Sequence, residues 1–141
     1  MYPPRGSADA YRSTAIHSGV DLPPERKIAL LLGGIIDKLQ VAESQINNGQ
    51  MAEKLRTIDS VLTILEALRA SLDFESGGAI ADQLSSVYTT AEAQLVQANA
   101  GNDVSKLHSV IRLLAPIREA FQQIAVPAPS AADDAPESRR G

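Results

Sequence analysis

The sequence lacks cysteine and tryptophan, and it has only three tyrosines and two phenylalanines among 141 residues. Without cysteine the chain forms no disulfide bond and no thiolate metal site, a composition typical of a reducing compartment. The scarcity of aromatic side chains leaves few platforms on which nucleic-acid bases could stack. The formal net charge of −4 also argues against the positively charged surface that binds phosphate backbones. We therefore expect no nucleic-acid partner.

Long apolar runs are also missing. The longest, residues 28–36, is interrupted by Gly33 and Gly34 and has about half the length needed to cross a bilayer. The first residues, MYPPRGSADAYRS, contain no positively charged region followed by an apolar core, so they predict no signal peptide. These observations predict a cytoplasmic protein without membrane insertion.

Groups suited to catalysis are scarce, because the chain has two histidines and no cysteine. A di-iron site in a helical bundle needs Glu three residues before each His, but Thr14 precedes His17 and Ser105 precedes His108 at that spacing. Two isolated histidines give no nucleophile–base pattern. The glycines at 77–78 are not followed by the lysine of a phosphate-binding loop. We expect no catalytic residue, no metal and no cofactor.

What the sequence does contain is helical periodicity. Apolar residues recur at steps of three and four, the spacing of one face of an α-helix, over four segments at roughly 24–47, 51–72, 76–101 and 102–124. Short connections between long helices favour antiparallel neighbours. The predicted fold is therefore all-α: an antiparallel up-down-up-down four-helix bundle in residues 23–125, after a partly ordered N-terminal lead (1–22) and before a disordered C-terminal tail (126–141).

Helix ends and core rows follow from residue type. Pro24 suits a first helical turn, Ser76 is the predicted N-cap of the third helix, and Gly101 is predicted to end that helix in a left-handed conformation. Asn102 is the predicted N-cap of the fourth helix, in which Pro116 should produce a kink but no break. The predicted core rows are Ile28, Leu32, Ile35, Leu39, Ala42 and Ile46; Leu55, Ile58, Leu62, Leu65 and Leu72; Ile80, Leu84, Val87, Ala91, Leu95 and Ala98; and Leu107, Val110, Leu114, Ile117, Phe121 and Ile124.

An ordered set of short motifs resembles the flagellar secretion chaperones, the FliS family, over residues 11–124. The motifs are Ser71-Leu72-Asp73, Glu75, Gly77-Gly78, Ile80-Ala81, Leu84, Tyr88, Leu95, Ala98-Asn99, Asn102-Asp103, Leu113-Leu114 and Ile117-Arg118-Glu119-Ala120-Phe121. The chain departs from the family pattern at Leu32 and Gly33, where an aromatic and an acidic residue are usual, and at 89–91. Trp is common in the family where Phe121 stands.

The resemblance implies a function. Members of the family are small cytosolic bundles that bind the carboxy-terminal segment of flagellin, prevent its premature polymerisation and aid its delivery to the flagellar type III export apparatus. Export gate components and a second copy of the chain are further expected partners. Two alternatives remain open: a histidine phosphotransfer bundle that uses His108, although residues 110–112 replace the usual Lys-Gly pair, and a self-associating helical scaffold.

The expected partner surface consists of apolar residues that lie outside the predicted core rows, together with residues that the resemblance suggests. Exposed together, such side chains would form patches that a partner normally covers. Tyr88 matches a family tyrosine and is expected at the edge of an apolar face, with its hydroxyl group reaching solvent or a partner. The expected partner-binding residues are Tyr11, Ile16, Leu30, Val41, Val61, Ile64, Tyr88 and Leu113.

Overall fold

The structure, a computed structural model, describes residues 22–125. These residues form four helices, α2 (Pro24–Asn47), α3 (Met51–Ala70), α4 (Phe74–Gly101) and α5 (Val104–Ala125), and within this range there is no strand. The all-α prediction is confirmed, and the first helix has the predicted bounds. Residues 1–21 of the lead and the whole of the tail, and with them Tyr11 and Ile16, lie outside the described residues.

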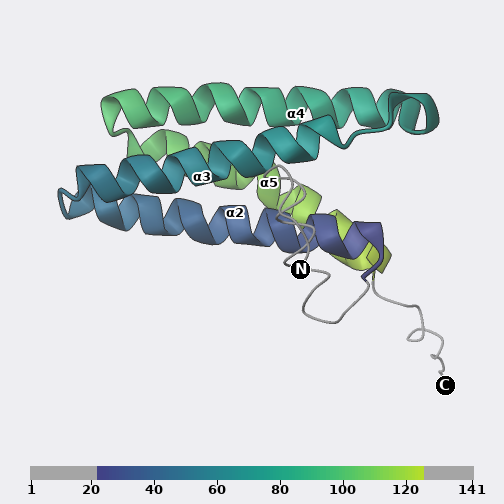
Figure 1. The fold of residues 1–141 in the computed structure, drawn as a ribbon, viewed down its shortest axis with the longest axis horizontal. Helices are drawn as coiled ribbons and strands as arrows, with labels where there is room; N and C mark the ends of the chain where they lie inside the picture. The colour runs from purple at the N-terminus through teal and green to yellow at the C-terminus, as the bar shows by residue number, and fades with distance from the viewer. Residues whose placement is uncertain (1–21, 126–141) are drawn as a thin grey trace, which may run out of the picture.

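The four helices form a ring. α2 packs against α3 and α5, and α4 packs against the same two helices. Each helix therefore lies beside its neighbours in the chain, and α5 closes the ring against α2 (Figure 1). This is the predicted up-down-up-down four-helix bundle. Among the described residues, no helix is both long and apolar enough to cross a membrane.

The helix caps differ from the predictions by one to three residues. Asp73, not Ser76, caps α4: its Oδ1 accepts hydrogen bonds of 3.1 Å from the backbone N–H groups of Glu75 and Ser76. Asn102, not Gly101, has the left-handed conformation after α4, with φ 50°. Asp103 then caps α5 by accepting from the Ser105 backbone N–H at 3.0 Å. Asn tolerates a positive φ, and Asp caps a helix as well as Asn does. Residue type alone therefore did not decide whether Asn102 ends α4 or caps α5.

Hydrogen bonds to these two caps favour their charged forms. The backbone N–H of Ser76 is the main cause of the lowered pKa of the Asp73 carboxyl group, and a hydrogen bond from the Ser105 side chain is the main cause at Asp103. Negative charge is also favourable beside the positive end of a helix dipole. The connections at both ends of α4 are thereby fixed by carboxylates.

The helix break predicted at residues 75–78 is confined to one residue in the structure. Gly78 has φ 53° and ψ −126°, outside the helical region, while its neighbours on both sides are helical. Only glycine adopts that conformation without steric cost, so this position interrupts α4 close to its start.

The core is as predicted on α2 but rotated on α3. Leu32, Ile35, Leu39 and Ala42 are buried, whereas on α3 the predicted core residue Leu55 is exposed and its neighbour Lys54 is buried. Lys54 Nζ donates to the backbone oxygen of Asn99 at 2.9 Å and to its Oδ1 at 2.7 Å. The lysine cation thus lies at the carboxyl-terminal end of α4, where helix carbonyls carry partial negative charge.

This rotation corrects two predictions. Val61 and Ile64, which were expected on the surface, are buried in the core with Ile58, Leu65 and Leu68. Buried side chains of this size each contribute about 1.5–3 kcal/mol relative to exposure, so Val61 and Ile64 stabilise the bundle itself.

Leu114→Ala should lower the free energy of unfolding by about 2–5 kcal/mol, because the leucine is completely buried and its loss leaves a cavity. Urea denaturation followed by circular dichroism measures the change. The matched control is Leu55→Ala, which truncates an exposed leucine and should change stability by less than about 1 kcal/mol. Equal effects of the two substitutions would contradict the burial pattern.

Candidate partner-binding site

Burial along the core face of α4 falls toward the start of that helix. Ala98, Leu95, Ala91 and Tyr88 are buried and Leu84 is half-buried; one turn further the small Ala81 is still buried, whereas the larger Ile80 beside it is 67% exposed. These residues follow one another at steps of three and four, so they lie on one face of the helix. The large apolar side chains of α4 are therefore less covered at this end than in the middle of the bundle.

Burial along α5 falls toward its end in the same way. Leu107, Val110 and Leu114 are buried, whereas Ile117 and Phe121 are half-buried. Ile124, one turn further, is 65% exposed. α4 and α5 are antiparallel neighbours, so the start of α4 and the end of α5 lie at the same end of the bundle.

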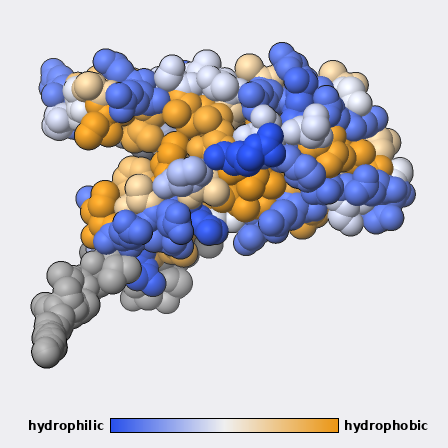
Figure 2. All heavy atoms as spheres, turned by 180° about the vertical axis from the view of Figure 1, so that it is seen from behind, coloured by the Kyte–Doolittle hydropathy of each residue, from blue (hydrophilic) through white to orange (hydrophobic). Residues whose placement is uncertain are grey.

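The two helices diverge at that end. Figure 1 shows α4 running above α5, with the two helices separating toward the start of α4 and the end of α5. The view from behind, in Figure 2, shows a hollow between two arms of the molecule, and hydrophobic surface lines it. We call this end the mouth and define it by Ile80, Leu84 and Val87 of α4 and Ile117, Phe121 and Ile124 of α5.

The mouth suits an apolar helical or extended segment of a partner protein. Its side chains are aliphatic apart from Phe121, and large exposed apolar surfaces on monomers commonly mark binding sites. An amphipathic helix places apolar side chains on one face at steps of three and four, which matches a groove between two helices. The arrangement can bury a partner surface, and it offers no group for chemistry.

The predicted partner residues do not gather at one place. Leu30 and Val41 are exposed on α2, at 54% and 49%. Leu113 of α5 is half-buried beside the core. Tyr88 is buried, and burial raises the pKa of its hydroxyl group to about 12, so the expectation that this hydroxyl group reaches solvent is wrong.

The mouth residues were predicted as core, because periodicity identifies the face of a helix but not the length over which a neighbour covers it. Two signals lay close to this end. Gly78 interrupts the start of α4, and Pro116 lies in α5 between buried Leu114 and half-buried Ile117. α5 remains one helix through Pro116, as predicted. A proline or a glycine inside a helix indicates irregular backbone or packing at its own position.

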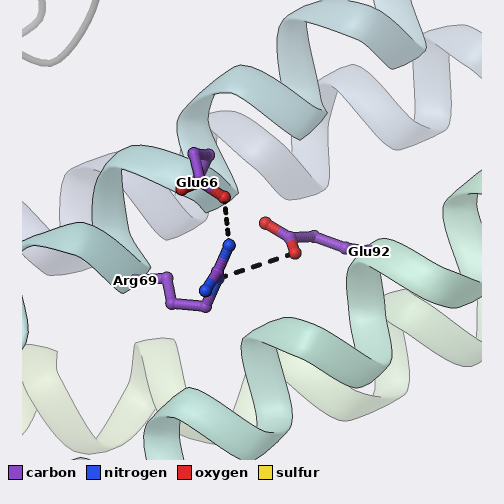
Figure 3. A network of polar contacts seen from close by, with 3 residues as sticks. All are labelled: Glu66, Arg69 and Glu92. Atoms are coloured by element: carbon purple, nitrogen blue, oxygen red, sulfur yellow. Dashed lines mark hydrogen bonds and ion pairs between the residues drawn. The ribbon is translucent and has the colours of Figure 1, made fainter.

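An ion-pair network joins α3 to α4 in the arm that holds the start of α4 (Figure 3). Arg69 of α3 contacts Glu66 on its own helix, and its Nε lies 3.7 Å from Glu92 Oε1 on α4. Burial raises the pKa of the Glu92 carboxyl group, the Arg69 charge opposes this rise, and Glu66 adds to it. Partly exposed pairs of this kind contribute about 0.2–1 kcal/mol each.

The imidazole ring of His108 pairs with a carboxylate on α2. Its Nε2 lies 2.8 Å from Glu43 Oε1, and both side chains are partly exposed. A phosphoryl group on that nitrogen would meet the carboxylate of Glu43, so the pair does not favour phosphotransfer. Among residues 22–125 no cluster of three metal-ligating side chains is present.

The described residues thus form an all-α four-helix bundle with exposed apolar side chains at one end. Residues 6–128 match the family described as flagellar protein FliS. The flagellar secretion chaperone FliS of Vibrio cholerae is 31% identical over 121 residues, which cover 85% of this chain and 89% of the relative. The flagellar secretion chaperone FliSB of Pseudomonas aeruginosa is 35% identical, covering 81% and 91%. FliS of Salmonella typhimurium is 33% identical, covering 82% and 87%. The chain belongs to the FliS family.

Glu92→Gln should remove the part of the pH dependence of stability that the Glu92 carboxyl group contributes. Because folding raises the Glu92 pKa, the folded wild-type protein binds a proton more readily than the unfolded chain, and this contribution to stability is lost as pH rises through the folded pKa. The free energy of unfolding of the wild type, relative to Glu92→Gln, should therefore increase as pH falls from about 7 to about 4. Urea denaturation at a series of pH values measures it. A difference independent of pH would contradict the assignment.

Proposed function

We propose that this protein is a cytoplasmic export chaperone that binds the carboxy-terminal segment of flagellin at the mouth. The single observation that carries the proposal is the open apolar end of a bundle that belongs to the FliS family. The relatives are secretion chaperones by name, and a chaperone needs an apolar surface that its client can bury.

The physical basis is the exposure of apolar surface by the client. A segment that later packs in the core of a filament carries apolar faces, and in the unassembled protein such faces promote aggregation. Burying one of these faces against Ile80, Leu84, Ile117 and Phe121 removes it from water and blocks contacts with other flagellin molecules. The protein thereby prevents premature polymerisation.

Release follows from the cost of ordering the client. A segment that folds on binding loses chain entropy, so its affinity is modest for the area that it buries. The complex is then stable enough to deliver flagellin to the export apparatus, and export components can displace the chaperone. No step in this process requires catalysis.

The lead segment is proposed to take part in the same site. Tyr11 and Ile16 are its substantial apolar side chains near the bundle sequence, and a lead that covers the mouth would compete with the client. Competition of this kind lowers the observed affinity by the fraction of molecules that are closed.

Substitutions at the mouth should weaken client binding without unfolding the bundle. Ile80→Ser and Phe121→Ser remove exposed or half-buried apolar side chains, so each should weaken binding of flagellin by about tenfold or more, with little loss of helical signal. Titration calorimetry with flagellin measures affinity, and circular dichroism measures folding.

The matched control is Leu55→Ser, a change of the same type at the opposite end of the bundle, which should bind as the wild type does. Flagellin without its carboxy-terminal segment should not bind. Normal binding by both mouth variants would mean that the client occupies another surface, with the exposed residues Leu30 and Val41 the next to test.

Deleting residues 1–17 should tighten flagellin binding and increase self-association, because both processes compete with a lead that covers the mouth. Calorimetry and light scattering measure the two effects. Weaker binding would instead mean that the lead holds the client, and unchanged binding would mean that it takes no part.

A further inference from the structure

Arg118 of α5 lies across the backbone of Gly33 of α2. A Cβ atom placed on Gly33 would be 3.6 Å from Arg118 Cδ and 3.8 Å from its Nη1. The arginine therefore rests against a position that has no side chain, in the seam between the two helices. Both distances are ordinary van der Waals contacts, so the site tolerates a side chain at residue 33.

The guanidinium group of Arg118 has no anionic neighbour among the described residues. Its Nε is buried and has no hydrogen-bond partner there, and no described carboxylate lies within ion-pair distance. A buried donor without an acceptor is costly, and a charged donor more so.

Arg69 provides the internal comparison. Its Nε is also buried without a hydrogen bond, but two carboxylates, Glu66 and Glu92, lie around that guanidinium group. The charge of Arg69 is therefore balanced within the fold. The charge of Arg118 is not balanced by any described residue. Arg118 is half-buried, as Arg69 is, and an unbalanced charge is unfavourable in such an environment.

The position of Arg118 places it beside the proposed client site. It follows Ile117 directly and precedes Phe121 by one helical turn, and both are mouth residues. On the α2 side, Leu30 is one turn before Gly33 and is exposed. A segment that enters the mouth and continues over the end of α2 would pass close to the guanidinium group.

We propose that Arg118 binds a carboxylate of the client through its terminal Nη atoms, because the Nε is buried, and that the client thereby balances the charge. The guanidinium group presents paired N–H donors in a plane, and a carboxylate accepts two of them in parallel. The inference rests on the proposed function and adds a charged contact to an otherwise apolar site. The carboxylate belongs either to an acidic side chain of the client or to its C-terminal carboxyl group.

A double-mutant cycle tests whether Arg118 is free to pair with a carboxylate. Gly33→Asp places a carboxylate against the guanidinium group, and Gly33→Asn is the matched control of the same shape without charge. Gly33→Asp should raise the unfolding midpoint more than Gly33→Asn, and the difference should disappear in the Arg118→Gln background. An equal effect of Asp and Asn in the wild-type background would overturn the proposal.

Client binding tests the rest. A synthetic peptide of the flagellin carboxy-terminal segment is titrated into the full-length protein. Arg118→Gln removes the donor and Gly33→Asp occupies it, so each should weaken binding by about tenfold or more, whereas Gly33→Asn should bind as the wild type does. Folding of each variant is checked by its unfolding midpoint.

The peptide is then varied to identify the acceptor. One peptide carries an amidated C-terminus, and another has amides in place of its acidic side chains. One of the two should bind the wild-type protein more weakly than the parent peptide does, by the same factor as the Arg118→Gln substitution causes. If neither loses affinity, or if either Arg118→Gln or Gly33→Asp binds normally, this inference is wrong while the proposed function stands. If the wild-type protein does not bind the parent peptide, the proposed function fails, and the inference fails with it.

Discussion

The structure depends on unequal burial along the antiparallel pair α4 and α5. At the end where α4 leads into α5, small and aliphatic side chains such as Ala98, Leu95, Leu107 and Val110 are completely buried. The buried Lys54 links α3 to the last turns of α4 at this end. These contacts supply the stability that allows the other end to remain open. A bundle packed evenly along its length would have no apolar surface to offer.

An open end has a cost that the fold must offset. Each exposed apolar side chain forgoes stabilisation of about 1.5–3 kcal/mol that burial would provide. The arm formed by α3 and α4 compensates in part through polar contacts: Asp73 caps α4, and Arg69 pairs with Glu66 and Glu92. Polar contacts of this kind position the arm without filling the hollow with hydrophobic side chains. Tight packing and exposed apolar surface thus lie at opposite ends of one set of helices.

The fold was predictable from the sequence to a greater depth than the site. Spacing of Leu32, Ile35 and Leu39 defined the core face of α2, and Pro24 marked its start. The same spacing did not reveal that α3 is rotated to bury Lys54, because that choice depends on an acceptor, Asn99, far away in the sequence. It also did not reveal the mouth. Both Ile80 and Ala81 continue the row of Leu84 and Tyr88 by spacing, and the structure buries Ala81 and exposes Ile80, a choice that tertiary packing makes.

The two arginines with buried Nε atoms show how one residue type takes two roles in such a bundle. Arg69 has its carboxylates within the fold, and removing them would leave an unbalanced charge in an arm whose position matters for the mouth. Arg118 lies against a glycine, and nothing in the described part of the chain balances it. An apolar groove alone discriminates poorly between hydrophobic segments, because a single methylene contributes only about 1–3 kcal/mol to selectivity. One unbalanced cation at its edge adds a requirement for an acid at a fixed distance from the apolar face, so that an otherwise permissive surface accepts a particular register of its client.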